Sequence, residues 1–273
     1  MRRHRPRPVV PSRGQGPVER VRIGPVWLDA VTFDEALDEI ERLAVSGIGG
    51  AVFTPNVDHM VNLARLPAFR AAYSRASLAL VDGQALLWAS RLLGTGLPEK
   101  ISGSDLVPKV LERAGQRGLR VYFLGGAPGV AAEAAEMARR RYGVAVAGVD
   151  CPMVSGDGEA PPEVIDRIRE ARPHLLLVAL GAPKQELFAD RYREQLGPVV
   201  SLGIGASLDF VAGRVRRAPA WVSRAGFEWL FRMAQDPRRL ARRYLVDDPR
   251  FAGIFLRTLL VPRAERLQMR KSP

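Results

Sequence analysis

The sequence predicts an α/β fold in which a doubly wound, mostly parallel β-sheet is followed by a C-terminal helical appendage. Three observations lead to this fold class. Six short apolar runs recur between residues 51 and 204, and helix-length segments with one apolar face separate them. Several runs are apolar without alternation, as expected for strands that helices cover on both faces. No further strand-like run follows residue 213, where the chain becomes rich in Arg, Trp and Phe.

The N-terminal part of the chain leads into the first predicted helix. Residues 1–20 are rich in Arg, Pro and Gly without periodicity, and they predict a disordered basic tail. A short extended segment is expected over residues 21–28. Thr32 and, three positions later, Glu35 form a capping-box pattern, which predicts a helix that ends near Val45.

Strands and helices then alternate along the chain. We expect strands at 51–54, 78–81, 119–124, 144–149, 175–180 and 199–204. We expect helices at 57–76 with a break near Pro67, and at 84–93, 104–117, 128–142, 161–171 and 184–196. Repeated strand-then-helix order favours a Rossmann-like sheet, which residues 21–213 would form. Residues 214–273 are the predicted appendage, with helices at 219–235, 237–246 and 249–260.

Composition excludes several classes of protein. The chain has 273 residues, of which 47% are apolar, and its single cysteine is Cys151. Fully disordered, collagen-like and disulfide-stapled proteins are therefore excluded. The sequence shows neither an apolar run of about 18 residues nor a secretory signal. We therefore expect a protein on the cytoplasmic side of the membrane, without a transmembrane helix.

Positive charge is concentrated at both ends of the chain. Of the net charge of +12, residues 1–22 carry +6 and residues 214–273 carry +10, which leaves −4 for the segment between them. Basic ends favour an anionic partner, such as nucleic acid, anionic lipid or a phosphorylated substrate. An arginine-rich bias of the whole proteome is the alternative, since only four of the 41 basic residues are Lys.

The turns after the predicted strands are the candidate site segments, because ligands of open parallel sheets bind beyond the carboxyl ends of the strands. These turns read TPNVDH (54–59), DGQ (82–84), GGAPG (125–129), GAPKQE (181–186) and GIGASLDF (203–210). The glycine-rich turns either point N–H groups at phosphate oxygens or form tight connections between a strand and a helix.

Polar residues in these turns are the candidate chemical groups. Asp82 directly follows an apolar strand, and it is either a general base or the N-cap of the next helix. Thr54 and Asn56 offer neutral hydrogen bonds. Lys184 and Gln185 share one turn after a buried strand, where polar groups suggest a ligand; Lys184 is otherwise the first-turn residue of a solvated helix.

Other chemistries lack their motifs. His4, His59 and His174 are scattered, and no cluster of His, Cys and Asp has metal-ligand spacing. The sequence has no G-x-S-x-G elbow and no Walker A loop, and it matches G-x-G-x-x-G only loosely. Metal-free chemistry with a phosphate leaving group fits best. A nucleotide-dependent oxidoreductase and a basic nucleic-acid-binding module are the alternatives.

Seven sequence blocks, in this order, resemble the WecG/TagA/CpsF glycosyltransferases. The blocks lie within about residues 21–246 and read TPNVDHMVNLAR, LVDGQALLWASRLLG, EKISGSDLVP, YFLGGAPGVAAEAA, VALGAPKQE, GIGASLDFVAGRVRRAPAW and EWLFRMAQDPRRLARRYL. The resemblance implies an inverting enzyme that moves a sugar from a UDP-sugar to a polyprenyl-diphosphate-linked acceptor at the inner face of the bacterial membrane. It also makes residues 21–213 the catalytic domain.

The resemblance implies roles for particular residues. Asp82 is the implied base, and Thr54 and Gln185 are implied active-site residues. If Asp82 is not the base, Asp58 and Glu186 are the next candidates. Lys100 stands where the family usually has Arg, so it keeps the charge but loses bidentate binding of a diphosphate. The implied substrate contacts are Asn56, Lys100, Gly125, Gly126, Gly181, Lys184, Gly205, Asp209, Arg232, Arg239 and Arg242.

Partners and location follow from the same reasoning. We expect a UDP-sugar donor, a polyprenyl-diphosphate-linked acceptor and an anionic membrane surface, with no nucleic acid, no metal and no other cofactor; homo-oligomerisation is left open. The appendage mixes Arg with Trp and Phe, which favours the lipid headgroup region at the inner face of the membrane. The alternative is a helical bundle packed on the sheet, with Arg side chains in solvent.

Overall fold

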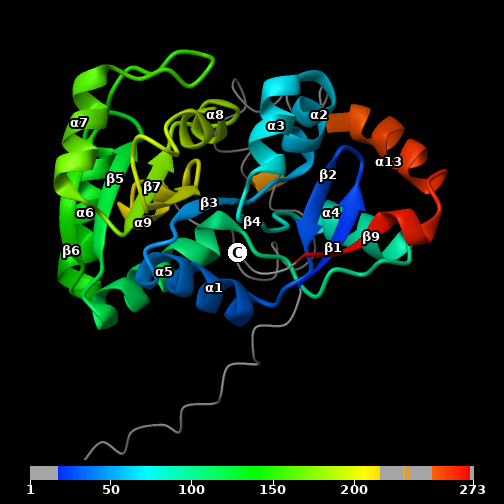
Figure 1. Ribbon diagram of the computed structural model, residues 1–273, viewed down its shortest axis with the longest axis horizontal. Coiled ribbons are helices and arrows are strands. Elements are labelled where there is room, and N and C mark those ends of the chain that lie inside the picture. Colours follow the sequence, from blue (N-terminus) through cyan, green and yellow to red (C-terminus); the bar gives the residue numbers. More distant parts are fainter. Residues whose placement is uncertain (1–17, 216–229, 232, 234–247, 271–273) are drawn as a thin grey trace, which may run out of the picture.

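Six parallel strands form the central sheet of the computed structural model, which describes residues 18–215, 230–231, 233 and 248–270 (Figure 1). Neighbouring strands follow the order β4-β3-β8-β7-β5-β6, and every pair is parallel. The strands are β3 (Gly50–Phe53), β4 (Leu78–Ala79), β5 (Arg120–Gly125), β6 (Ala145–Asp150), β7 (Leu175–Ala179) and β8 (Val200–Gly203). All six predicted strands are therefore present, although β4, at the edge of the sheet, is shorter than expected.

Helices connect the strands, as the sequence predicts. The Thr32 and Glu35 side chains each bond the other residue's backbone N–H, so the predicted capping box forms. Pro67 opens a new helix and so produces the predicted break. The helices are α1 (Phe33–Val45), α2 (Val57–Arg65), α3 (Pro67–Ser74), α4 (Gln84–Leu92), α5 (Gly103–Arg117), α6 (Val130–Tyr142), α7 (Pro162–Ala171), α8 (Lys184–Arg191) and α9 (Ser207–Val211).

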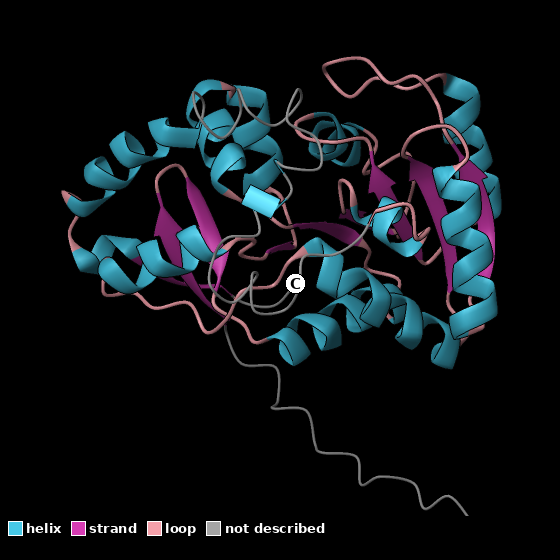
Figure 2. Cartoon of the chain, turned by 180° about the vertical axis from the view of Figure 1, so that it is seen from behind, coloured by secondary structure: helices cyan, strands magenta, loops and turns pink. Residues whose placement is uncertain are grey.

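The helices cover both faces of the sheet. One apolar core joins α1, α5, α6 and α9 to one face, and further cores join α2, α3, α7 and α8 to the other. Figure 1 shows α1 and α5 on one side of the strands and α2, α3 and α8 on the opposite side. Figure 2 shows the same layers from behind. The doubly wound α/β fold is confirmed.

A second, three-stranded antiparallel sheet lies beside the main one and joins distant parts of the chain. It has the order β2-β1-β9, with β1 (Val18–Ile23), β2 (Val26–Asp29) and β9 (Leu267–Arg270). Two predictions need correction here. Residues 18–20 are strand rather than irregular tail, and the appendage contains a strand where only helices were expected. β9 has no apolar run that predicts it, and it forms because β1 offers an unpaired edge.

The described part of the appendage packs on the small sheet. A short 3₁₀ helix, η2 (Asp248–Arg250), leads into α13 (Phe251–Leu259), close to the predicted helix 249–260. The Gly24 N–H in the β1–β2 turn donates to Thr258 Oγ1 at 2.9 Å. The predicted helix 237–246, and 219–235 except residues 230, 231 and 233, lie outside the described residues. Among the described residues, no helix combines the length and apolar character that crossing a bilayer requires.

Candidate active site

Three neighbouring strands, β3, β8 and β7, bring the turns that follow them to one edge of the sheet. Thr54 and Asn56 follow β3, Gly205 follows β8, and Gln185 lies in α8 after β7. The helices α2 and α8 pack on one face of the sheet, whereas α9, after β8, packs on the other. Ligands of open α/β sheets bind where the connections of neighbouring strands diverge in this way. This edge is therefore the candidate active site.

Asn56 caps α2, and His59 is its partner one turn later. Asn56 Oδ1 accepts the His59 backbone N–H at 3.4 Å and lies 2.8 Å from His59 Nδ1. The other ring nitrogen, Nε2, lies 3.2 Å from Glu186 Oε1. Glu186 is fully buried and His59 is only 7% exposed. This chain of polar groups therefore runs inside the protein.

Gln185 extends the chain of polar groups to β8. Its Nε2 donates to Glu186 Oε1 at 2.9 Å, and its Oε1 accepts the Gly205 N–H at 2.9 Å. Buried polar groups persist in proteins when they are hydrogen-bonded in this manner. We refer to Asn56, His59, Glu186, Gln185 and Gly205 as the edge network. It ties together the turns after three adjacent strands.

An aromatic cluster fixes the position of the His59 ring. The ring centroids of His59 and Phe69 are 6.0 Å apart, with an angle of 30° between the ring planes. Tyr73 lies next in the cluster, 5.1 Å from Phe69 and 5.0 Å from Phe53 between centroids. Phe53 and Phe69 are fully buried, so the ring of His59 is held by packing as well as by hydrogen bonds.

The electrostatics at Tyr73 place three carboxylates around this part of the site. Burial raises the pKa of Tyr73 well above its ordinary value, and the negative charges of Glu186, Asp82 and Asp58 raise it further. The Tyr73 hydroxyl has no hydrogen-bond partner among the described residues. Asp82 therefore acts on the same region as the edge network, although it follows a different strand.

Asp82 lies three residues after β4, and its backbone N–H donates to the Pro55 carbonyl at 2.9 Å. Gly83, at a φ of 101°, is the N-cap of α4, so the alternative interpretation of Asp82 as the cap is wrong. The Ile101 N–H donates to the Val81 carbonyl at 2.7 Å, which brings the neighbouring Lys100 to this edge. The half-buried Asp82 thus stands beside the turn that holds Thr54 and Asn56.

The first turn of α5 also reaches the site, which the sequence patterns did not indicate. A Cβ atom at Gly103 would lie 3.0 Å from Ser207 Oγ and 3.6 Å from Thr54 Oγ1. The absence of a side chain at Gly103 thus lets the positive end of α5 approach the turns after β3 and β8. A glycine between Ser102 and Ser104 at a helix start was the signal available in the sequence.

The glycine-rich turn after β5 matches the tight-connection interpretation. Gly125 and Gly126 have positive φ values of 97° and 81°. The Gly126 N–H donates to the Ala179 carbonyl at 2.9 Å, so this group is already bonded within the sheet. A Cβ at Gly125 would lie 2.7 Å from the same carbonyl oxygen. Glycine is therefore needed here for close packing of β5 against β7.

Two predicted substrate contacts, Gly181 and Lys184, lie in the turn after β7 and at the start of α8. Gly181 adopts a φ of 73°, and its carbonyl accepts the Gln185 N–H at 3.0 Å. Lys184 is the first residue of α8, and its ammonium group donates to the Val154 carbonyl at 2.9 Å. Lys184 is thus a first-turn residue of α8, as one of its two interpretations states, and it also holds the loop after β6 against the helix. Its contact with a substrate stays a prediction.

Asp209 lies in α9, toward the C-terminal end of the α/β domain. Its carbonyl accepts the Arg214 N–H at 3.0 Å. The Arg214 guanidinium forms a two-point ion pair with Glu133 of α6, and this hydrogen bonding lowers the pKa of Glu133. The last three predicted contacts lie outside the described residues; they are Arg232, Arg239 and Arg242.

Arginines pair with two acids of the segment 150–159. Asp150 accepts hydrogen bonds from Tyr122 and Arg167, and Asp157 pairs with Arg191 at 2.5 Å. Within the described ranges, no three His, Cys, Asp or Glu side chains converge so that they could hold a metal ion.

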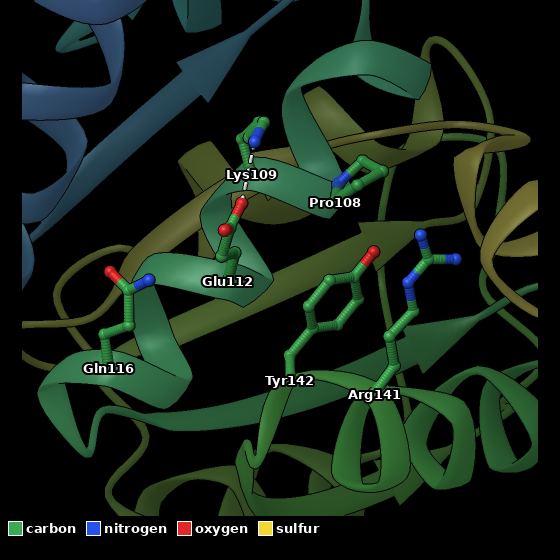
Figure 3. A pocket seen from close by; sticks show the side chains of 6 residues that line it. All are labelled: Pro108, Lys109, Glu112, Gln116, Arg141 and Tyr142. Carbon is green, nitrogen blue, oxygen red and sulfur yellow. Dashed lines mark hydrogen bonds and ion pairs between the residues drawn. The ribbon is translucent and has the colours of Figure 1, made fainter. Parts of the chain in front are cut away.

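A pocket of about 540 Å³ lies elsewhere, between the C-terminal halves of α5 and α6 (Figure 3). Both helices end there, before β5 and β6 begin, so this pocket is at the amino edge of the strands. It is therefore separate from the candidate active site. Its lining residues are Pro108, Lys109, Glu112, Gln116, Arg141 and Tyr142.

The α/β fold has a sheet edge where an acid, side-chain amides and helix N-termini meet. Comparison with known proteins gives the class of protein to which this fold and site belong. Residues 21–265 match the glycosyl transferase WecG/TagA/CpsF family, and the chain belongs to that family. The protein is therefore a glycosyltransferase, and the oxidoreductase and nucleic-acid-binding alternatives are rejected. Among its relatives is the N-acetylglucosaminyldiphosphoundecaprenol N-acetyl-beta-D-mannosaminyltransferase of Bacillus spizizenii, 33% identical over 210 residues, which are 77% of this chain and 79% of the relative.

His59, like Gly103, is a site residue that sequence reasoning missed. His59 is one of three scattered histidines, and no metal or nucleophile motif includes it. The available signal was its distance of three residues from Asn56, which is the spacing of a capping box with His in place of Glu. Glu186, a further candidate for the base, is fully buried.

Proposed function

We propose that the protein transfers a sugar from a UDP-sugar, with inversion, to a hydroxyl of a polyprenyl-diphosphate-linked saccharide during synthesis of a cell-envelope polysaccharide or teichoic-acid-type polymer. The observation that carries the proposal is the meeting of Asp82 with the turns of Thr54, Asn56 and Gln185 at one sheet edge. The name of the Bacillus relative supports the acceptor class, and N-acetylmannosamine is the first donor sugar to test.

Asp82 supplies the base in this proposal. Its carboxylate removes the proton of the acceptor hydroxyl while the hydroxyl oxygen bonds to the anomeric carbon of the donor. The bond from that carbon to the diphosphate breaks on the opposite face, and UDP leaves with the electron pair. A single carboxylate is sufficient for this displacement, because the leaving group carries its own negative charge.

Positive groups would stabilise the departing diphosphate. The first turn of α5, beside Thr54, presents backbone N–H groups and the positive end of the helix dipole. Lys100 lies directly before this turn. The sequence also predicts three arginines as contacts for the negative charge of the diphosphate: Arg232, Arg239 and Arg242. Interactions that strengthen as charge develops on the leaving group accelerate the reaction.

A transfer assay tests the proposal directly. The protein is incubated with a lipid-diphosphate-linked N-acetylglucosamine acceptor and UDP-N-acetylmannosamine, UDP-N-acetylmannosaminuronic acid or UDP-glucose in turn. We expect a disaccharide product from one donor, with inverted anomeric configuration by NMR. Transfer from none of the three donors, or a product that retains the donor configuration, would contradict the proposal. Calorimetry with UDP, NAD and an oligonucleotide should show binding of UDP alone.

We also propose that the reaction needs no metal ion. Support comes from the donor set, since the described residues hold no cluster of metal ligands and two acids of the segment 150–159 pair with arginines. Activity should survive EDTA. Loss of activity that Mg²⁺ or Mn²⁺ restores would contradict this, and would direct attention to Asp209 and residues 150–159.

A peripheral position at the inner face of the membrane is the third part of the proposal. The helix α13 exposes apolar side chains, with Leu256 at 60% and Leu260 at 86% exposure, next to the exposed Arg257 and Arg263. Apolar side chains beside basic ones suit the headgroup region, where each basic residue adds about 1 kcal/mol of attraction to anionic lipid.

Point variants test membrane binding better than truncation before Arg214, because truncation also removes β9 from the small sheet. The double variant Leu256→Ser/Leu260→Ser should bind vesicles that contain phosphatidylglycerol more weakly, and added salt should weaken the wild type too. Val45→Ser, on the exposed part of α1, is the matched control. Equal binding of both variants would contradict the proposal. Homo-oligomerisation is left open, and light scattering would measure the oligomeric state.

A further inference from the structure

Helix α4 turns an apolar face toward solvent. Trp88 is 48% exposed, and Leu92, one turn later on the same face, is 73% exposed. Between Gln84 and Gly96 the chain has a single charged residue, Arg91, which is exposed as well. The outer face of a surface helix is ordinarily polar, so a tryptophan and a leucine together on this face indicate that it has a partner.

The end of α4 meets the chain that follows α13. A Cβ atom at Gly94, two residues after Leu92, would lie 4.0 Å from Arg263 Nε. Figure 1 shows α4 and α13 at the same end of the molecule, beside the small sheet. The exposed apolar residues of the two helices therefore lie on one end of the protein. We refer to the following exposed residues as the end patch: Trp88, Arg91, Leu92, Leu256, Leu260 and Arg263.

The charge around the end patch has one sign. Residues 84–96 and 251–263 together hold three arginines, Arg91, Arg257 and Arg263, and no Asp or Glu. All three are exposed. Contact between two copies of this patch would bring like charges together, whereas an anionic bilayer supplies the opposite charge. Tryptophan is also typical of the boundary between water and lipid. The end patch therefore fits an anionic lipid surface better than a second copy of the chain.

We propose that the exposed face of α4 is a second membrane-contacting surface, which forms one lipid-facing patch together with α13. The inference rests on the proposed function, which places α13 at the membrane. It adds the helix that begins after its N-cap Gly83, and Gly83 directly follows the proposed base, Asp82. One helix thus joins the surface that contacts lipid to the residue that removes the acceptor proton.

The length of α4 limits the distance between the base and the lipid. The nine residues of α4 span about 14 Å at a rise of 1.5 Å per residue. Asp82 precedes the first turn and Leu92 is in the last, so the base lies within about one helix length of the end patch. An acceptor held in the bilayer by its polyprenyl chain has its diphosphate among the headgroups and its sugar just outside them. Contact of α4 with lipid therefore brings Asp82 to the height of the acceptor sugar.

Spin labels test the contact directly. The chain has one cysteine, Cys151, so the variant Cys151→Ser gives a background in which a single new cysteine can be labelled. Labels are introduced with Leu92→Cys on α4, Leu260→Cys at the end of α13 and Val45→Cys at the end of α1. When vesicles that contain phosphatidylglycerol are added, the labels at 92 and 260 should become more accessible to oxygen and less accessible to a water-soluble nickel complex. The label at 45 should stay in water.

The three labels separate the outcomes. A label at 92 that stays in water while the label at 260 enters lipid would overturn the inference and leave the proposed membrane contact of α13 intact. If all three labels stay in water, the membrane part of the proposed function fails together with the inference. A label at 92 that is protected from both reagents, with a doubled mass in light scattering, would assign the patch to a second copy of the chain and would also overturn the inference.

Transfer assays test what the contact does for the reaction. The double variant Trp88→Ser/Leu92→Ser should bind the same vesicles at least about tenfold more weakly, because two apolar side chains no longer enter lipid. Its kcat/KM should fall to a similar extent with an acceptor embedded in vesicles. With a short-chain, water-soluble acceptor its kcat/KM should stay within about twofold of the wild-type value, since membrane contact is then irrelevant. Wild-type vesicle binding and wild-type kcat/KM with the embedded acceptor would overturn the inference.

A matched control and an independent readout complete the test. Val45→Ser/Ile48→Ser changes two exposed apolar residues at the end of α1, outside the end patch, and should keep the wild-type values with both acceptors. Thermal unfolding shows whether each double variant is folded at the assay temperature, and the spin-label measurement does not use the serine variants. If the wild type transfers no sugar from any donor, the proposed reaction fails, while the labels still decide whether α4 contacts lipid.

Discussion

Two buried carboxylates, Glu186 and Asp29, show how differently this fold uses the same chemical group. Glu186, at the candidate active site, accepts hydrogen bonds through Oε1 from His59 and Gln185. Asp29 lies where the small sheet meets the main one. Its Oδ1 is 3.3 Å from both Arg20 Nε and an Arg270 guanidinium nitrogen, and its Oδ2 accepts the Ala79 N–H of β4 at 2.8 Å.

The partners account for the difference. Asp29 meets two arginines, from β1 and β9, so it joins strands that are distant in the sequence. Burial raises the pKa of Asp29 and lowers the pKa of Arg20, which means that desolvation outweighs their attraction. This cluster therefore specifies how the strands assemble. Glu186 instead bonds His59 and Gln185 of the edge network, so its partners belong to the candidate active site rather than to the joining of strands.

Removal of the proposed base should have the largest effect on turnover of any single substitution. Asp82→Asn should reduce turnover by about 10²–10⁴-fold, because the acceptor proton then has no base. The Kd for UDP and the free energy of unfolding should stay near the wild-type values. Transfer assays, calorimetry and urea unfolding measure the three quantities. If Asp82→Asn kept near-normal turnover, Asp58 would be the next candidate for the base.

A change at the other carboxylate should reverse this pattern. Asp29→Ala leaves the buried Arg20 beside the half-buried Arg270 without this counter-charge, so the free energy of unfolding should fall by about 3–5 kcal/mol. The kcat of the molecules that stay folded should be unchanged. Asp29→Asn is the control, because its amide oxygen can still accept the Ala79 N–H, and its loss should be smaller. A drop in kcat with unaltered stability would contradict the comparison.

Protonation of Asp29 should give stability a recognisable dependence on pH. Burial raises its pKa in the folded protein above the ordinary value of 3.8. Between these two pKa values the folded state binds the proton that the unfolded state has released. The free energy of unfolding contributed by this group therefore falls as pH rises through the window, by at most about 1.4 kcal/mol per pH unit.

The measurement compares two proteins. Urea unfolding from about pH 4 to pH 7 of the wild type and of Asp29→Asn gives a difference in which other titrating groups cancel. That difference should change with pH in the direction stated, since Asn at this position does not titrate. A wild type that gains stability relative to Asp29→Asn as pH rises would show that the two arginines outweigh burial.

Local signals predicted most of the main sheet. The Thr32–Glu35 capping box, the break at Pro67 and all six apolar strands are where the sequence indicates, because each depends on residues close in the chain. β9 was not predicted, because its pairing with β1 joins residues about 250 positions apart and shows no local pattern. Non-local contacts decide such strands.

The candidate site was predicted in part for the same reason. The rule that ligands bind at the carboxyl ends of strands located the turns of Thr54 and Asp82. The bonding of Gly126 to Ala179 and of Lys184 to Val154 depends on which strands and loops become neighbours, which composition does not reveal. The link from His59 to Glu186 spans 127 positions of sequence, so only the fold displays it.

The smallest expected effect separates the edge network from the aromatic ring beside it. Tyr73→Phe removes a buried hydroxyl that has no hydrogen-bond partner among the described residues, and it keeps the ring contacts with Phe53 and Phe69. The free energy of unfolding should be unchanged or up to about 1 kcal/mol higher, because an unsatisfied polar group costs free energy in the folded state. Turnover should match the wild type.

Tyr192→Phe is the matched control for this last change. The buried Tyr192 hydroxyl accepts the Ala160 N–H at 3.1 Å and donates to the Ala160 carbonyl at 3.3 Å. Its removal leaves a buried backbone pair unsatisfied, so stability should fall by about 1–3 kcal/mol. Urea unfolding compares the two variants. A loss of that size in Tyr73→Phe, together with a fall in kcat, would show that Tyr73 acts on Glu186 and belongs to the edge network.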